Sequence, residues 1–271
     1  MQTLREIASR RELFVNLTLR ELRSKYKRSV LGWAWSMLNP LTTLLIYATV
    51  FGIFLRVEPD VGDPSGLKNF AMFLMCGLLP YTFLANGLNA GMTSLIGNAN
   101  LVQKVYFPRE ILVGATVASW LVSFLIELGV LALVLAFFGN IVVPWVPVVL
   151  LLVVLQTMFV TGIALALAGA AVYFRDLQHL LGLVLQVWLY SAPIVYPVAL
   201  VEGEVGTSGW KITLYNLNPL TRFVEAYRDA FYHLRLPPLD DLAYLVGVSV
   251  AVLLAGWWAF SRLEGRLAEE L

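Results

Sequence analysis

Few side chains in this sequence carry charge. Charged residues make up 14% of the 271 residues, whereas hydrophobic residues make up 59%. A water-soluble domain uses about a quarter charged residues to cover its surface, so part of the solvent of this chain is expected to be lipid. The net charge of +1 gives no basic field that would attract nucleic acid, and no nucleic-acid partner is expected.

Cysteine and histidine are almost absent. The single cysteine, Cys76, excludes an intramolecular disulfide. The two histidines, His179 and His233, are far apart in sequence and give no metal-ligand spacing. No metal site is therefore expected.

Nucleotide-binding and catalytic motifs are missing as well. The chain contains neither GxxxxGK(S/T) nor GxGxxG after a strand. No Ser/His/Asp order and no paired carboxylates occur on plausible loops. A membrane enzyme would need a polar catalytic cluster at one membrane face, so this alternative function is disfavoured. If the protein does energy-driven work, ATP and Mg²⁺ are expected to bind in a partner chain, with no cofactor in this one.

Six apolar stretches reach the roughly 20 helical residues that a bilayer core requires. They run approximately over Leu31–Leu55, Phe70–Leu88, Ile111–Phe138, Val146–Tyr173, Leu180–Val198 and Leu242–Phe260. They are too uniformly apolar for the alternating strands of a membrane barrel. The sequence therefore predicts an all-α membrane protein, with one six-helix domain over residues 30–271 after a segment of residues 1–29.

Basic residues set the expected orientation. They crowd the segment before the first span and outnumber those on the opposite side of the predicted membrane. By the positive-inside rule both termini are cytoplasmic. The charged segment 1–29 is not a signal peptide, which would carry an apolar stretch within its first residues.

Residues 2–28 show a helical pattern. Leu4, Ile7, Phe14, Val15 and Leu22 fall in one angular sector, with charged residues largely opposite, although Leu13 and Leu17 depart from it. This predicts an amphipathic helix along the cytoplasmic membrane surface. A solvated charged tail is the alternative.

The external segment, approximately residues 199–241, is too polar to span. Asn218 and Pro219 are typical of a helix start, and Leu220, Phe223, Tyr227 and Phe231 follow at helical spacing. We expect short re-entrant helices here, between the fifth and sixth spans.

Two cytoplasmic loops are candidate handles for a partner. The loop Asn98–Arg109 predicts a short helix with Leu101, Val102 and Val105 as its apolar face, whose side chains could enter a groove on a partner. An ordinary interfacial loop is the alternative. In the shorter loop around Phe174–Leu177, Arg175 and Asp176 either pair locally and cap the next helix or contact the partner.

Five runs, in order along the chain, resemble the permease subunits of type-2 ABC exporters, and above all the branch that exports lipid-linked polysaccharides such as O-antigen, teichoic acid, capsule and cell-wall galactan. They are LGWAWSMLNPLTTLLIY (Leu31–Tyr47), NLVQKVYFPREIL (Asn100–Leu112), YFRDLQHLLGLVLQ (Tyr173–Gln186), SAPIVYP (Ser191–Pro197) and NPLTRFVEAYRDAF (Asn218–Phe231).

The resemblance implies a homodimer bound to two copies of a separate ATPase, exporting a lipid-linked glycan across the bacterial plasma membrane. Residues 98–107 would form the coupling helix, with Arg175 and Asp176 as a smaller second contact and the N-terminal helix nearby. The implied coupling residues of that helix are Asn100, Leu101, Val102, Lys104, Val105, Tyr106 and Phe107. A permease for a smaller amphiphile, a drug or a lipid, is the alternative, which the short external loop and the aromatic content disfavour.

Aromatic side chains are candidates for the substrate path because sugar C–H faces stack on rings. The candidates are Trp33, Tyr47, Phe51, Tyr81, Trp188, Tyr190, Tyr196, Phe223 and Tyr227. The alternative for each is packing or a place in the aromatic belt at the membrane surface.

Glu127 is the one carboxylate deep in a predicted span. A charge there must face protein or water or be protonated. With no basic partner visible within the spans, a structural role is favoured over a place on the path.

Overall fold

The computed structural model describes residues 2–25, 34–54, 61–104, 107–198, 201, 203 and 209–266, and the regular secondary structure of this part of the chain is helical. The α-helices are α1 (Gln2–Lys25), α2 (Trp35–Tyr47), α3 (Phe70–Gly97), α4 (Ala99–Lys104), α5 (Glu110–Phe137), α6 (Val146–Tyr173), α7 (Leu177–Ser191), α9 (Trp210–Asn216), α10 (Pro219–Arg228) and α11 (Leu239–Leu263). Two π-helical segments, η2 (Ala48–Phe54) and η4 (Asp229–His233), continue α2 and α10, and two 3₁₀ turns, η3 (Val143–Trp145) and η5 (Glu264–Arg266), precede α6 and follow α11.

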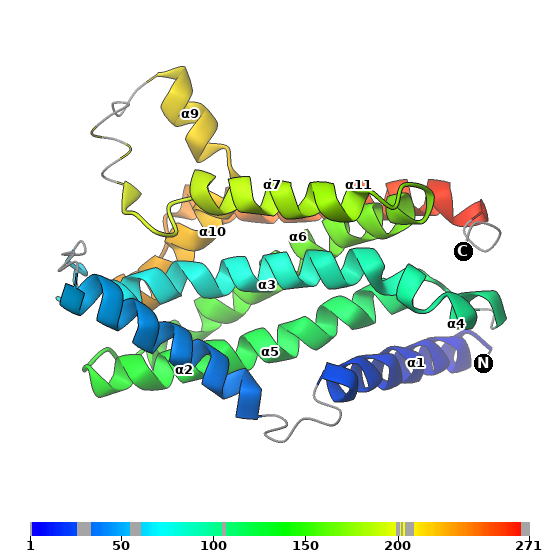
Figure 1. The fold of residues 1–271 in the computed structure, drawn as a ribbon, viewed down its shortest axis with the longest axis horizontal. Coiled ribbons are helices and arrows are strands. Elements are labelled where there is room, and N and C mark those ends of the chain that lie inside the picture. Colours follow the sequence, from blue (N-terminus) through cyan, green and yellow to red (C-terminus); the bar gives the residue numbers. More distant parts are fainter. Residues whose placement is uncertain are drawn as a thin grey trace.

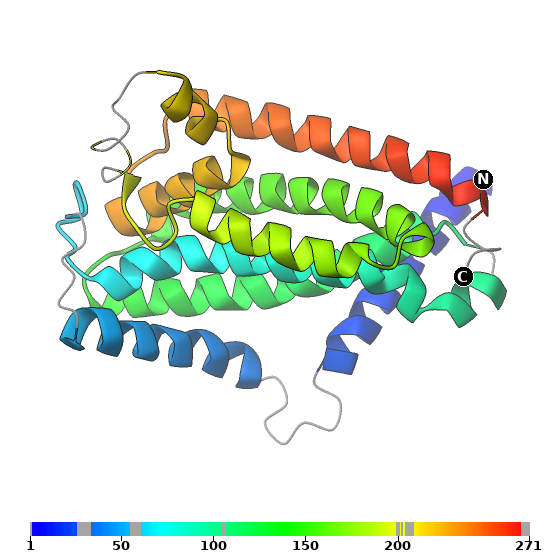
Figure 2. The same cartoon turned by 45° about the horizontal axis from the view of Figure 1, so that its top comes forward.

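The helices form an elongated bundle in which α3, α5, α6, α7 and α11 run along the long axis (Figures 1 and 2). The start of α1, helix α4, the turn between α6 and α7 and the end of α11 lie together at one end, which we call the terminal face. Helices α9 and α10 lie at the opposite end, which we call the distal end. The order of the helices thus separates the two cytoplasmic loops predicted from the sequence from the predicted external segment.

Four helices in the described part of the chain are long and apolar enough to cross a bilayer: Phe70–Gly97, Glu110–Phe137, Val143–Tyr173 and Leu239–Leu263. The other two predicted spans are shorter. The apolar part of α2 and η2 covers Leu41–Val50, and α7 has 15 residues, which make about 22 Å of helix against a bilayer core of about 30 Å. The structure therefore shows an all-helical protein with four such spans, and the count of six stays a prediction.

Helix α3 lies at the centre of the bundle and is the most buried of the four spans. Asn69 begins it, because its side chain accepts a hydrogen bond from the Met72 backbone N–H at 3.3 Å. Inside the helix, Gln156 of α6 donates from Nε2 to the Pro80 carbonyl at 2.7 Å. This contact between buried groups ties α6 to α3 beside the proline, where the regular helix bonding is interrupted.

Helices α6 and α11 pack closely against each other, and glycines permit this contact. A Cβ atom added at Gly256 would lie 2.5 Å from the carbonyl carbon of Gly162 and 2.9 Å from its Cα. A Cβ added at Gly162 would lie 2.6 Å from the carbonyl carbon of Val252. The two backbones therefore touch, as small residues allow in membrane helix pairs.

Helix α1 forms as predicted, and it packs against α5 with more than the predicted apolar sector. Leu22 of that sector is buried, and the Phe14 ring borders Gly114 of α5, where an added Cβ would lie 3.4 Å from it. Leu17, which departed from the sector, is buried as well, while Val15 is 45% exposed. The place of this helix along the membrane surface stays a prediction.

The start of α10 agrees with the sequence. The Asn218 side chain accepts a hydrogen bond from the Leu220 backbone N–H at 3.1 Å, and Pro219 occupies the first turn. The four apolar residues predicted at helical spacing, Leu220, Phe223, Tyr227 and Phe231, are all buried. Short helices at the distal end are therefore observed within the described part of the predicted external segment.

Candidate functional site

Helix α4 projects from the terminal face after a single junction residue. The Asn98 carbonyl accepts hydrogen bonds from the N–H groups of Leu101 and Val102, at 2.9 and 3.1 Å. The Asn98 side chain donates to the Ser94 carbonyl of α3 at 2.9 Å. Asn98 therefore ends α3 and begins α4, as the sequence allowed.

The outward face of α4 is polar. Val102 is buried in the core of this chain and Leu101 is partly buried against it, so both side chains pack on the bundle here, and their contact with a partner groove stays a prediction. Asn100, Gln103 and Lys104 are exposed. The apolar residues hold α4 to the bundle, and the polar ones are free to meet a partner. Val105 and Tyr106 lie outside the described residues, and Phe107 is half-buried.

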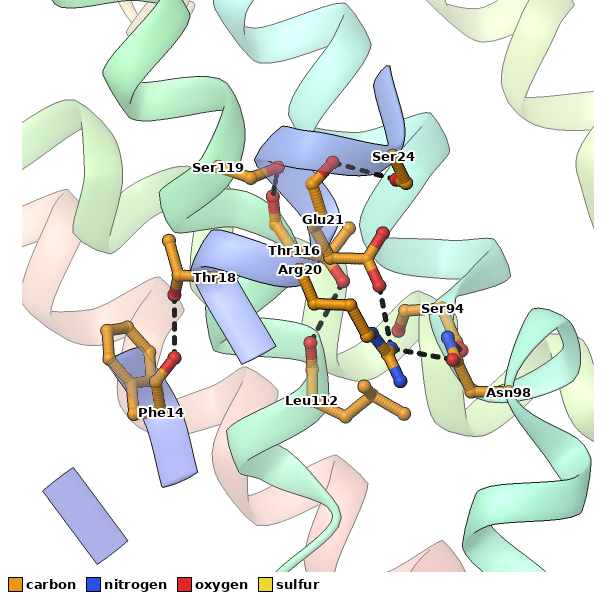
Figure 3. Close-up of polar contacts among 10 residues, drawn as sticks. All are labelled: Phe14, Thr18, Arg20, Glu21, Ser24, Ser94, Asn98, Leu112, Thr116 and Ser119. Carbon is orange, nitrogen blue, oxygen red and sulfur yellow. Dashed lines mark hydrogen bonds and ion pairs between the residues drawn. The ribbon is translucent and has the colours of Figure 1, made fainter. Parts of the chain in front are cut away.

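A hydrogen bond links α1 to the junction between α3 and α4. Arg20 donates from Nη2 to the Asn98 side-chain oxygen at 2.7 Å, and the same nitrogen pairs with Glu21 at 2.7 Å (Figure 3). Asn98 is thereby shared by three helices: α3, which it ends, α4, which it begins, and α1, which donates to it. A displacement of α4 is expected to reach α1 through this contact.

The turn between α6 and α7 is exposed at the same face. Phe174 is 65% exposed, and the side chains of Arg175 and Asp176 are exposed too. Asp176 occupies the N-cap position of α7 without a side-chain capping bond, and the ion pairs of the described residues do not include one between Arg175 and Asp176. Asp176 therefore lies at the start of α7, as the first alternative had it, but neither the local ion pair nor the side-chain cap of that alternative forms, and both charged side chains are exposed.

Two further hydrogen bonds tie the terminal face to the end of α11. Arg109, just after α4, donates from Nη1 to the Glu264 carbonyl at 2.5 Å. Tyr173, at the end of α6, donates its hydroxyl hydrogen to the Leu263 carbonyl at 3.1 Å. The terminal face is thus one connected unit of α1, α4, α6 and α11.

At the distal end, most of the candidate path aromatics are engaged in structural contacts. Trp188 donates its indole N–H to the Asn218 side-chain oxygen at 2.8 Å, the same oxygen that caps α10. Tyr81 of α3 donates to the Leu185 carbonyl of α7 at 2.9 Å. These bonds fix α7 against α3 and α10. One side of Trp188 still borders an open apolar groove along α7, with Leu183, Val184, Val187 and Ser191.

Phe223 and Tyr227 do not reach a surface. Both are fully buried in α10, where Phe223 packs against Phe159 with ring centroids 5.8 Å apart and Tyr227 meets Phe124 edge-on at 5.9 Å. Their assignment to the substrate path is therefore corrected to core packing. Helical spacing identified the buried face of α10 but does not distinguish core from path.

The other path candidates differ in exposure. Tyr190 is 63% exposed, Tyr47 and Tyr196 are half-buried, and Tyr196 donates to the Tyr190 carbonyl at 3.0 Å. Trp33 and the side chain of Phe51 lie outside the described residues. No group of three or more His, Cys, Asp or Glu side chains within the described ranges is arranged to hold a metal ion.

Known proteins match this chain over most of its length. The family described as "ABC-2 type transporter" matches residues 12–232. The chain belongs to the ABC-2 type transporter family. The O-antigen export system permease protein RfbA of Myxococcus xanthus is 30% identical over 99% of this chain and 98% of its own length. RfbA of Klebsiella pneumoniae is 29% identical over 96% and 95%, and the polysialic acid transport protein KpsM of Escherichia coli is 25% identical over 89% of both chains.

In this ABC-2 transporter subunit, sequence reasoning missed a fully buried cation. Arg228 of α10 is 1% exposed. It pairs through Nη1 with Glu225 at 2.7 Å, donates from Nη2 to the Ile194 carbonyl at 2.8 Å, and lies over the Phe73 ring, 3.7 Å from its centroid. Arg228 follows Leu220 and Val224 at four-residue intervals, a spacing that could have placed it on the buried face.

Arg228 holds together three separate parts of this ABC-2 protein: α3, α10 and the turn after α7. Next to it, burial raises the pKa of Asp229 to about 6, and Arg235, bonded to the Asp229 carboxylate at 2.7 Å, opposes that rise. The distal end is thus held by compensated charges.

Proposed function

We propose that this chain is the membrane-spanning permease of an ATP-driven exporter that moves a lipid-linked polysaccharide from the cytoplasm to the outer side of the bacterial plasma membrane. The observation that carries the proposal is the match with an O-antigen export permease over 99% of this chain and 98% of the relative. Family membership and the missing nucleotide motifs support placing ATP hydrolysis in a partner chain.

The terminal face is proposed to receive that ATPase. Its support is the exposed polar surface of α4 and the exposed, unpaired charges of the α6–α7 turn, which lie at one end of the bundle. The proposed contacts are Asn100, Lys104, Arg175 and Asp176, with Gln103 added by its exposure. Leu101, Val102 and Phe107 are proposed to support α4 from within, and Val105 and Tyr106 stay proposed contacts of the ATPase.

Six spans with both termini cytoplasmic are proposed. Besides the four long helices, α2 together with η2 forms one of these spans, and α7 forms another. Supporting this, α7 runs along the axis of the bundle, although 15 residues require a locally thin bilayer or protein neighbours. Apolar side chains of α7, including Leu183 and Val187, are 62% and 69% exposed. This exposed surface of α7 is proposed to form the contact within a homodimer, to which two ATPase copies bind. The glycan path is proposed to run along α7 past Tyr190. Helix α10 is proposed to be a re-entrant helix at the outer mouth of that path.

The ATPase contact is tested by co-purification. The chain is expressed with ABC ATPases of the same genome, purified through a tag on the chain, and assayed for ATP hydrolysis. Lys104→Glu is expected to weaken the complex about tenfold, because reversing an interfacial charge costs on the order of 1.4 kcal/mol or more.

The matched control is Lys68→Glu, which reverses an exposed lysine ahead of α3, away from the terminal face. Equal co-purification and equal ATP hydrolysis of the two variants would overturn the assignment of α4.

The substrate is tested separately by deleting the gene: lipid-linked glycan should accumulate inside the cell and disappear from its surface. Unchanged surface glycan would overturn the proposed cargo in favour of a smaller amphiphile.

A further inference from the structure

The last residue of α1 reaches into a polar strip on α5. Lys25 donates from Nζ to the Ser119 carbonyl at 3.0 Å, approaches the Ser123 hydroxyl at 3.4 Å, and lies over the Trp120 ring, 3.6 Å from the centroid. Three buried hydroxyl residues, Thr116, Ser119 and Ser123, follow one another along α5 at this position. The end of α1 therefore penetrates beside a span and does not only lie at its entrance.

The depth of this contact follows from helix geometry. Ser119 and Ser123 are nine and thirteen residues after Glu110, the first residue of α5, which places them about 14 to 20 Å along the helix. The whole helix has 28 residues, or about 42 Å. Lys25 thus meets α5 near the middle of its length.

Glu127 continues the same face of α5, one turn beyond Ser123, where side chains four residues apart are neighbours. It borders a small cavity between α2, α3 and α5 whose other walls are apolar, among them Leu44, Leu79 and Val130. Burial lowers the pKa of Lys25 to about 7, and the nearby carboxylates of Glu127 and Glu21 oppose that fall. Lys25 and Glu127 form no direct ion pair in the structure, but both lie next to Ser123, Lys25 through its bond to the Ser123 hydroxyl and Glu127 one helical turn further along the same face.

We propose that Lys25 and Glu127 are a positioning pair that holds the end of α1 against the middle of α5. Whether the proton resides on the amine or on the carboxyl group, the pair has no net charge, which makes it tolerable beside a span. Removing Lys25 leaves Glu127 at a cavity whose other walls are apolar, which is costly, whereas removing Glu127 leaves Lys25 its bonds to Ser119 and Ser123. The pair therefore stabilises the protein mainly when both members are present.

The pair has a consequence for transport, which rests on the function proposed above. Arg20, five residues before Lys25, holds Asn98 at the base of α4. Helix α1 is thus attached at one point to the proposed ATPase contact and at another to the interior of α5. We infer that loosening the second point uncouples ATP hydrolysis from export, while the ATPase remains bound.

The pair itself is tested by a double-mutant cycle in detergent, a measurement that needs neither ATPase nor substrate. Lys25→Met is expected to lower the melting temperature by about 5 °C, and Lys25→Met with Glu127→Gln by clearly less than the sum of the two single effects. The matched control is Arg23→Met, an exposed cation on the same helix, whose effect should add to that of Glu127→Gln. Additive effects of Lys25→Met and Glu127→Gln would overturn the pair.

The consequence for transport is tested with the assembled complex. Lys25→Met should keep ATP hydrolysis within about twofold and lose most glycan export, and Lys25→Arg, which keeps the charge and a donor, should restore export. An unchanged ratio of export to hydrolysis in Lys25→Met would overturn the role in coupling. If no ATPase binds the wild-type chain, the proposed function fails, while the cycle in detergent still decides the pair.

Discussion

The contact between α6 and α11 leads to a quantitative prediction. In Gly256→Ala, the new Cβ would lie 2.5 Å from the carbonyl carbon of Gly162 and 2.9 Å from its Cα. Carbon atoms pack at about 3.5–4.0 Å, so the two helices must separate by about 1 to 1.5 Å. Backbone atoms cannot rotate away as a flexible side chain can, and the separation must extend along the pair.

The energy follows from that displacement. A gap of about 0.5–1 Å already forfeits a quarter to a half of the dispersion energy of each contact, and overpacking of a core typically costs about 1–3 kcal/mol. Since the obstruction is backbone against backbone, we expect the upper end, about 3 kcal/mol. At about 2–4 °C per kcal/mol, the melting temperature should fall by roughly 6 to 12 °C.

The assay is thermal unfolding of the detergent-purified protein followed by tryptophan fluorescence, to which Trp257 and Trp258 next to the substitution contribute. Gly247→Ala is the matched control on the same helix, because a Cβ there meets nothing within 4 Å. That variant should melt at or above the wild-type temperature, since alanine favours a helix over glycine by about 0.5–1 kcal/mol. Equal melting temperatures for Gly256→Ala and Gly247→Ala would refute the close backbone contact.

Two predictions concern the distal end. Arg228→Met removes the buried guanidinium from Glu225, from the Ile194 carbonyl and from the Phe73 ring. The free energy of unfolding should fall by about 3 kcal/mol, because hydrogen bonds to charged groups are worth about 1.5–3 kcal/mol each. A melting temperature within 2 °C of wild type would contradict this. Asn218→Ala removes the cap of α10 and the acceptor for Trp188, so it should cost about 1–2 kcal/mol, whereas Asn218→Asp keeps both acceptor functions and should cost less; equal melting temperatures of the two variants would show that the shared oxygen is unimportant.

Some features of the candidate site could be predicted from the sequence, and others could not. The start of α10 was predictable because a cap is formed by residues within three positions of each other, as in Asn218 and Leu220. The buried face of α10 followed from helical spacing. The exposure of Arg175 and Asp176 was not predictable, because local pairing was an equally good solution for two adjacent opposite charges. The inward packing of Val102 required knowledge of the neighbouring core.

Contacts across the chain were beyond sequence reasoning. Lys25 meets Ser119, and Arg20 meets Asn98, over separations of 94 and 78 residues. No periodicity in either segment indicates these partners. The burial of Leu17, outside the apolar sector predicted for α1, was hidden for the same reason, because it depends on the packing of α1 against α5.

By itself, the sequence determined that this chain is helical and membrane-embedded and that it lacks a known nucleotide-binding motif. The physical reason is that a bilayer forces each spanning segment to satisfy its backbone hydrogen bonds internally, so that a span is a property of local composition and length. Which faces of these helices meet was decided only by the tertiary structure. Helices that are apolar on all sides, such as α5 and α6, carry little periodic information about their neighbours. The positions of Gly162 against Gly256 and of Lys25 against Ser119 emerge only when the whole bundle packs.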